Sequence, residues 1–306
     1  MAVEVVGNRQ AAGFTTWLQA LYRRSETVRG YTLLSPTMII MLVALAAPMP
    51  LLALYSFWSQ DAYVLNTHFT LDQYDTTFGR DTYRELFYRS IYISSIVTLV
   101  TVLLAYPMAY FVAFRVEKSK FLWLILLTIP FWTSYLLRVF AWKIILGYNG
   151  VINSGLMSLG IIHEPLEFLL YNPFSVVITL AHAWAAFAIL PIYVSLEKID
   201  RSLLEAAADL GDGPIRRFFR ITLPLSLPGV IGAAVLIFVP TTGDYVTPSL
   251  VGGTDGVMIA NVIEVQFAKV GNWPLGAALA LASMAAVGVV TLLTVQAVRF
   301  AVSRAK

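Results

Sequence analysis

The chain has 306 residues, of which 58% are hydrophobic and 13% charged, and its mean hydropathy is +0.73. This composition excludes an ordinary soluble domain and is typical of an integral membrane protein. The formal net charge is only +3, and the absence of cysteine excludes disulfides, iron–sulfur centres and thiol catalysis.

Residues 1–32 precede the first long apolar stretch. Their polar part is long, and the apolar run after it is longer than the h-region of a cleaved signal peptide, so we predict no such peptide. Phe14, Trp17, Leu18 and Leu21 recur at helical spacing. This spacing predicts an amphipathic helix on the inner membrane surface, and a disordered tail is the alternative.

Six apolar stretches are each long enough to cross a hydrocarbon core of about 30 Å. We expect membrane spans at residues 33–58, 90–114, 121–146, 174–196, 225–250 and 275–300. Pro36 is expected in the first turn of the first span, and Pro48 and Pro50 are expected to kink its outer half. The segments between spans that are expected as external loops are 59–89, 147–173 (with one short helix) and 251–274.

The positive charges predict the orientation of the chain. Arg115, Lys118 and Lys120 follow the second span, and Lys306 ends the chain after further arginines. Short segments rich in Lys and Arg stay in the cytoplasm. We therefore predict an all-α integral membrane protein with six spans over residues 33–300 and both termini cytoplasmic, including the tail 301–306.

The segment 199–224 is the longest break in apolar sequence on the predicted cytoplasmic side. Ser202 and Glu205 have the spacing of a capping box, which predicts that a helix begins at Ser202. Strong helix formers follow, and Gly211 is expected to end this helix in the left-handed conformation.

A second short helix is expected directly after Gly211, with Asp212 or Gly213 as its cap and Pro214 in its first turn. Helices this short are marginal alone in water and need a surface to pack on. That surface belongs either to another protein or to the membrane bundle of the same chain. Composition and capping do not separate these two alternatives.

A transport path through the membrane would need polar or aromatic residues that are costly against lipid. Asp244 follows Gly243 in the fifth span, where we expect the helix to be broken; the carboxylate either faces a cationic substrate, caps a helix or pairs with Arg138. Aromatic side chains could hold an organic cation or serve as interfacial and packing residues. The candidate path residues are Asp244, Tyr245, Trp132, Tyr135, Arg138 and Trp184.

Several kinds of site have no signal in the sequence. No Gly-Lys dipeptide occurs, so there is no Walker A loop for binding ATP. His68, His163 and His182 are widely separated and lack metal-ligand spacing. We therefore expect no metal, no cofactor in this chain, no nucleic-acid partner and no enzymatic activity.

Seven residues at fixed spacing resemble the "EAA" signature of the membrane subunits of bacterial ABC importers. They are Glu205, Ala206, Ala207, Gly211, Ile221, Leu223 and Pro224. The whole chain after about Gly30 is similar to the spermidine/putrescine permeases of this group, in the segments 129–146, 205–211, 243–253 and 260–278. In that family the signature loop is the coupling helix, which lies in a groove of the ATPase subunit.

The resemblance implies a type I importer in the bacterial inner membrane. Two related permeases would pair as a heterodimer, two ATPase subunits would carry ATP and Mg²⁺, and a periplasmic protein would deliver the polyamine. The external loops, including residues 261–273, would meet that protein. Two alternatives remain open: a permease for another small organic solute, and a membrane scaffold that uses the same loop to hold a cytosolic protein.

Overall fold

The computed structural model describes residues 26–61 and 64–304 and divides into two compact units, residues 1–55 and 56–306. The first unit contains α2 (Glu26–Ala46) and most of α3 (Pro48–Ser56). The predicted kink falls at Ala47, because a proline disfavours helical geometry in the residue before it. Pro36, predicted in a first turn, lies instead inside α2. The amphipathic helix predicted around Trp17 lies outside the described residues.

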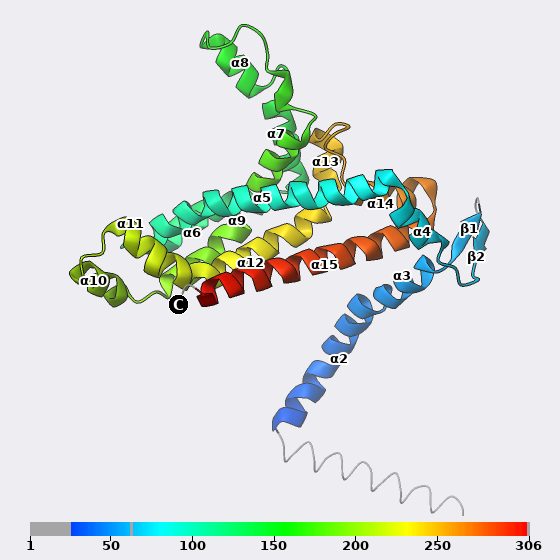
Figure 1. The fold of residues 1–306 in the computed structure, drawn as a ribbon, viewed down its shortest axis with the longest axis horizontal. Helices are drawn as coiled ribbons and strands as arrows, with labels where there is room; N and C mark the ends of the chain where they lie inside the picture. The colour runs from blue at the N-terminus through cyan, green and yellow to red at the C-terminus, as the bar shows by residue number, and fades with distance from the viewer. Residues whose placement is uncertain (1–25, 62–63, 305–306) are drawn as a thin grey trace, which may run out of the picture. The chain divides into compact units, whose positions relative to one another are not determined.

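Four long helices of the second unit lie side by side (Figure 1). They are α5 (Asp81–Phe114), α9 (Pro173–Glu197), α12 (Leu223–Thr242) and α15 (Trp273–Arg304). At one end of this bundle are a hairpin of β1 (Ser59–Asp61) and β2 (Val64–Asn66), followed by α4 (Asp72–Gly79). The shorter elements are α6 (Lys120–Thr128), η1 (Ile129–Trp132), α7 (Tyr135–Leu146), α8 (Val151–Ser158), η2 (Glu167–Leu169), α10 (Arg201–Asp209), α11 (Pro214–Arg217), η3 (Phe218–Thr222), α13 (Val246–Val251), α14 (Ile259–Val265) and η4 (Gln266–Val270).

The segment 59–89 is more ordered than the external loop that the sequence predicts. It contains the hairpin, α4 and the first two turns of α5. Tyr83 and Leu86 pack with Leu275 and Leu279 of α15 in a small buried cluster. This tertiary contact stabilises a polar stretch as helix, which its composition alone does not predict.

The main core surrounds α9, which packs against both α5 and α12. Leu180 and Ile189 of α9 are fully buried there, together with Val97 of α5 and Ile237 of α12. Gly229 permits the close approach of α12 to α9. A Cβ at Gly229 would lie 2.4 Å from Ser195 Cβ and 2.5 Å from the Pro191 carbonyl oxygen.

We expect Gly229→Ala to lower the thermal unfolding midpoint of the purified permease. The added methyl group would overlap a backbone atom that cannot move freely, and overpacking of this kind costs about 1–3 kcal/mol. Gly232→Ala is the matched control, because it lies on the same helix and a Cβ there meets no atom within 4 Å. This control should unfold at the same temperature or higher. Equal midpoints for the two variants would contradict the tight α9–α12 contact.

The prediction of six spans is confirmed in number and corrected in position. Among the described residues, six helical stretches are long and apolar enough to cross a membrane: Arg29–Ser56, Asp81–Phe114, Tyr135–Ser158, Pro173–Glu197, Pro214–Thr242 and Trp273–Ala297. The predicted third span, 121–146, is instead divided into α6 with η1 and α7. The predicted fifth span, 225–250, begins earlier and ends at Thr242.

Both divided spans break next to a proline. Pro130 cannot donate a backbone hydrogen bond, and the chain leaves the helix at Thr133, whose hydroxyl donates to the Pro130 carbonyl at 2.7 Å. Pro240 lies in the last turn of α12, which ends before Gly243. The break expected at Gly243 and Asp244 is therefore present, whereas Pro228 lies inside a continuous helix.

Candidate functional site

Residues 199–224, which carry the EAA signature, are called the EAA segment below. Its first helix, α10, begins one residue earlier than predicted. Asp200 is its N-cap, and the Asp200 carboxylate accepts a hydrogen bond from the Ser202 backbone N–H at 2.9 Å. Hydrogen bonds from the backbone and side chain of Ser202 lower the pKa of the Asp200 carboxyl. The predicted capping box of Ser202 and Glu205 is wrong, because Asp200 offers a charged acceptor two residues before Ser202.

The end of α10 agrees with the prediction. Gly211 has a φ of +88°, and its N–H donates to the Ala208 carbonyl at 2.9 Å. The Asp212 N–H donates to the Ala207 carbonyl, also at 2.9 Å. These two bonds form a Schellman motif, which turns the chain sharply after α10.

The second helix of the segment is not a separate short helix. Gly213 caps α11 and Pro214 lies in its first turn, as expected, but the helix continues through η3 into α12. The Leu223 N–H bonds to the Phe218 carbonyl five residues back, which makes this turn a π-helix. Pro224 has no N–H to continue the α-helical pattern, and π turns are frequent at functional sites.

Arg201 attaches the start of α10 to the end of α5, where Lys120 of α6 binds the same backbone carbonyl. Lys120 Nζ donates to the Ala113 carbonyl at 3.1 Å and to the Glu197 carboxylate at 2.7 Å. Arg201 donates to the same carbonyl at 3.4 Å. Phe218 packs edge-on against two tyrosines of α5. A displacement of α10 and α11 would therefore be passed to α5 and α12.

Large apolar side chains in the stretch from α10 to η3 are left uncovered. Leu210 is 87% exposed and Ile215 is 73% exposed, and Leu203 and Phe219 are exposed as well. Of the three consecutive alanines of α10, Ala207 is buried against its own chain, whereas its two neighbours are exposed. An apolar surface of this kind, in a polar loop, is typical of a protein contact.

The breaks in the two divided spans meet inside the second unit. The helix α7 begins after the first break and packs against α13, which begins after the second. Five of the six candidate path residues line one cavity of about 330 Å³ here: Tyr135, Arg138, Trp184, Asp244 and Tyr245. Trp132 does not line it and is 78% exposed.

Asp244 is held by hydrogen bonds to both of its oxygen atoms. Oδ1 accepts from the backbone N–H groups of Val246 at 2.8 Å and Thr247 at 3.2 Å, so the Asp244 side chain, one residue before the N-cap Tyr245, caps the first turn of α13. Oδ2 accepts from the hydroxyl groups of Thr247, at 2.9 Å, and Tyr135. The cap alternative raised by the sequence is therefore present, and no ion pair with Arg138 occurs among the described residues.

Arg138 and Trp184 provide donors to this cavity. The Arg138 guanidinium lies 4.9 Å from the Phe131 ring centroid and donates from Nη1 to the Ala183 carbonyl at 3.4 Å. Among the described residues, Arg138 Nε and Trp184 Nε1 are buried without a hydrogen-bond partner. Buried donors without partners are rare in folded proteins and indicate groups available to a ligand or water.

Sequence reasoning missed two residues that fix the break. Thr247 bonds to Asp244, and Asn261 of α14 donates from Nδ2 to the Tyr245 carbonyl at 2.7 Å and to the Ser249 hydroxyl at 2.8 Å. Asn261 was expected in the external loop 251–274, among the residues that would meet the binding protein. An amide within the apolar run around Ile259 was the available signal.

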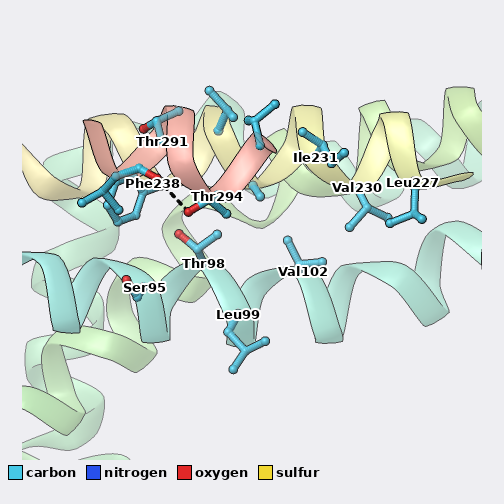
Figure 2. Close-up of a pocket in the computed structure, with 14 residues that line it drawn as sticks. Ser95, Thr98, Leu99, Val102, Leu227, Val230, Ile231, Phe238, Thr291 and Thr294 are labelled. Carbon is cyan, nitrogen blue, oxygen red and sulfur yellow. Dashed lines mark hydrogen bonds between the residues drawn. The ribbon is translucent and has the colours of Figure 1, made fainter. Parts of the chain in front are cut away.

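Other cavities adjoin α12 in the described part of the chain. One, of about 740 Å³, lies between α12, α14 and α15, and its lining includes Tyr245 and Glu264. Another, of about 290 Å³, lies between α5, α12 and α15 (Figure 2). Its lining is aliphatic apart from Phe238 and hydroxyl groups, and Thr98 and Thr294 bond back to their own helices at 2.7 and 2.8 Å. The described residues that line it include no charged group for a polar solute.

The chain is similar to characterised transport proteins over most of its length. It is 38% identical over 232 residues to the spermidine/putrescine transport system permease protein PotB of Escherichia coli (strain K12), covering 76% of this chain and 84% of that protein. It is 37% identical to PotB of Salmonella typhimurium (strain SL1344), with coverage of 76% and 80%. It is 30% identical to the sn-glycerol-3-phosphate transport system permease protein UgpA of Escherichia coli O6:K15:H31 (strain 536 / UPEC), with coverage of 65% and 68%.

The fold is that of a solved transporter chain. A crystal structure of a bacterial ABC transporter that imports the acidic polysaccharide alginate matches with a TM-score of 0.65 and 20% identity, covering 92% of this chain and 98% of that one. The family model described as "Binding-protein-dependent transport system inner membrane component" matches residues 35–302. This chain therefore belongs to the family of inner membrane components of binding-protein-dependent transport systems and is a multi-pass membrane protein.

Proposed function

We propose that this chain is a permease subunit of an ATP-driven importer that moves polyamines such as spermidine and putrescine across the inner membrane. The observation that carries the proposal is the 38% identity to PotB over 84% of its length. In this proposal the chain forms part of the path and catalyses no reaction. Both termini and the EAA segment lie in the cytoplasm, where Lys and Arg are retained.

ATP hydrolysis belongs to a partner in this proposal, because the sequence has no Walker A loop. The ATPase subunit binds the uncovered apolar residues of α10 and α11, including Leu210 and Ile215, and carries the nucleotide and Mg²⁺. Glu205, Ala206 and Gly211 belong to the contact, and the π turn before Pro224 connects it to α12. Two ATPase subunits would serve two permease chains, of which this is one and a homologous chain the other.

The path passes the junction of the two divided spans. Tyr135, Arg138, Trp184 and Tyr245 border the cavity, and Asp244 fixes the shape of the break and adds negative charge. A periplasmic binding protein delivers the polyamine to the external loops. This arrangement is supported by the family description and by the alginate transporter, which was solved in complex with a periplasmic protein.

A different small solute is the second candidate, because UgpA is also similar to this chain. Uptake of labelled spermidine, putrescine and glycerol 3-phosphate by the complete complex, reconstituted with its soluble binding protein, separates the two. We expect ATP-dependent uptake of a polyamine only. Uptake of glycerol 3-phosphate in its place would contradict the proposed substrate. An ATP-independent complex without an ATPase subunit would favour a membrane scaffold.

A further inference from the structure

The carboxylate of Asp244 has no position left for a bound cation. A carboxylate offers about four acceptor positions. Four donors already occupy them: the N–H groups of Val246 and Thr247 and the hydroxyl groups of Thr247 and Tyr135. An ammonium group of a substrate would have to displace one of these bonds and open the cap of α13.

The remaining polar groups of the smaller cavity also disfavour an ammonium group. Arg138 is positively charged and lines the same cavity, and the unpaired Arg138 Nε and Trp184 Nε1 are donors. Donors need an acceptor, which an alkylammonium group does not have. A cationic substrate is therefore not held by direct contact on this side of Tyr245.

Tyr245 and Gly243 line both this cavity and the larger one. Glu264 of α14 lies in the wall of the larger cavity and is the one acidic residue among the described residues that line it. Its side chain is 28% exposed, and Lys269 Nζ lies 3.7 Å from the Glu264 carboxylate. That distance is long for a charge-assisted hydrogen bond, and the Lys269 side chain is 67% exposed, so the lysine can move into solvent.

The larger cavity has the size and chemistry for a linear polyamine. Its volume of about 740 Å³ lies in the range of small-molecule sites. Apart from Glu264, the described lining consists of apolar, small and hydroxyl residues together with the aromatic rings of Tyr245 and Phe267. Aromatic rings attract ammonium groups, and methylene segments pack on apolar walls.

The structure also fixes the position of Glu264 relative to Tyr245. Asn261, one turn before Glu264 on α14, bonds to the Tyr245 carbonyl at 2.7 Å, and the Ile259 N–H bonds to the Ser90 hydroxyl at 2.7 Å. Gly276 of α15 lies against the Phe267 ring, where a Cβ would be 3.0 Å from the nearest ring atom. The helix that carries Glu264 is therefore held on both sides.

We propose that Glu264, and not Asp244, receives an ammonium group of the substrate, in the cavity bordered by Tyr245 and Phe267. The proposal rests on the proposed polyamine function. Lys269 pairs with the Glu264 carboxylate when the cavity is empty. The substrate ammonium group replaces Lys269 when the substrate enters. Tyr245 then borders both this cation site and the cavity around Arg138.

The first test compares Glu264→Gln with Lys269→Gln in the complete reconstituted complex. Glu264→Gln keeps the size of the side chain and removes its charge, so we expect about tenfold slower spermidine uptake at subsaturating concentrations of the loaded binding protein. Lys269→Gln removes the competing cation and should leave uptake equal to wild type or faster. Glu264→Asp keeps the charge, so its spermidine uptake should be faster than that of Glu264→Gln and slower than that of the wild type.

The second test uses the absence of cysteine from this chain. Ser283→Cys places a thiol in the wall of the same cavity without changing Glu264. A cationic thiol reagent should label it faster than an anionic reagent of the same size, and spermidine should slow the labelling. In the double variant with Glu264→Gln, the two reagents should label the cysteine at position 283 at equal rates. Spermidine should no longer slow the labelling.

The outcomes separate the two proposals. If the wild-type complex takes up spermidine and Glu264→Gln does so at the same rate, Glu264 does not bind the substrate. The proposed polyamine function would then still stand. Equal labelling by both reagents would overturn the Glu264 site as well, even if Glu264→Gln failed to assemble. No polyamine uptake by the wild-type complex would overturn the proposed function and, with it, this inference.

Discussion

Replacing Gly211 with aspartate should abolish coupled uptake while the chain still inserts into the membrane. Gly211 has a φ of +88°, where a residue with a Cβ is disfavoured by about 1–2 kcal/mol. The new carboxylate would also lie at the negative end of α10, between Asp209 and Asp212. The expected result is at least tenfold lower uptake per ATP hydrolysed, measured in proteoliposomes.

Gly211→Asn is the matched control for this prediction. Asparagine has nearly the same shape, tolerates the left-handed conformation and carries no charge. A Cβ at Gly211 meets no atom within 4 Å, so neither variant causes a steric clash within the chain. The asparagine variant should keep most of the coupled uptake. Normal transport by Gly211→Asp would show that this turn does not face the ATPase.

A charge reversal on α10 tests the same contact independently of backbone strain. Glu205 is exposed on α10 and is not needed for the cap, since Asp200 performs that role. Glu205→Lys should therefore leave the helix folded and still uncouple ATP hydrolysis from uptake. Crosslinking from Leu210 to the ATPase subunit gives a direct measurement. Crosslinks from Leu210 only to the same chain would contradict docking.

Asp244→Asn should reduce uptake by about tenfold or more, with little effect on the amount of assembled complex. Asparagine keeps one acceptor oxygen and places an NH₂ donor where Oδ2 now accepts from Tyr135 and Thr247. Loss of a hydrogen bond to a charged group costs about 1.5–3 kcal/mol. A cost of this size in the conformation that passes the substrate lowers the uptake rate about tenfold or more, whereas the packing of α9 on α5 and α12 is unchanged. Initial uptake rates and purified complex yield are the measurements.

Tyr135→Phe is the matched control at the same junction. It removes one hydroxyl donor to the Asp244 carboxylate and keeps the aromatic wall of the cavity. Its effect should be smaller than that of Asp244→Asn, because three donors to the carboxylate remain. Unchanged uptake kinetics in Asp244→Asn would show that the α12–α13 break does not border the path.

The sequence predicted the parts of this chain that depend on local interactions. Long apolar stretches require membrane spans, and their number agrees with the structure. Gly211 was identified as the end of α10 because only a left-handed residue suits a Schellman turn there. The break at Gly243 followed from glycine and Asp244 in an apolar run. The cap at Asp200 was misassigned because several residues near Ser202 can cap a helix.

The divided third span shows the limit of this reasoning. Residues 121–146 are apolar enough to be read as one helix, and Pro130 alone permits either a kink or a break. The structure has a break, because the start of α7 packs against α13 and Tyr135 bonds to Asp244, which lies 109 positions away in the sequence.

The sequence by itself determined that this is a six-span membrane protein with a capped helical segment at residues 199–224, because hydropathy, helix caps and glycine conformations act over a few residues. Only the tertiary structure decided which polar groups share a cavity and which are already satisfied. It joined Asp244 to Tyr135 and placed Glu264 beside Tyr245, because those contacts depend on how distant helices pack. Whether a charged side chain in a membrane protein can bind a ligand depends on which groups already bond to it. Those groups come from distant parts of the sequence, so the order of residues does not specify them.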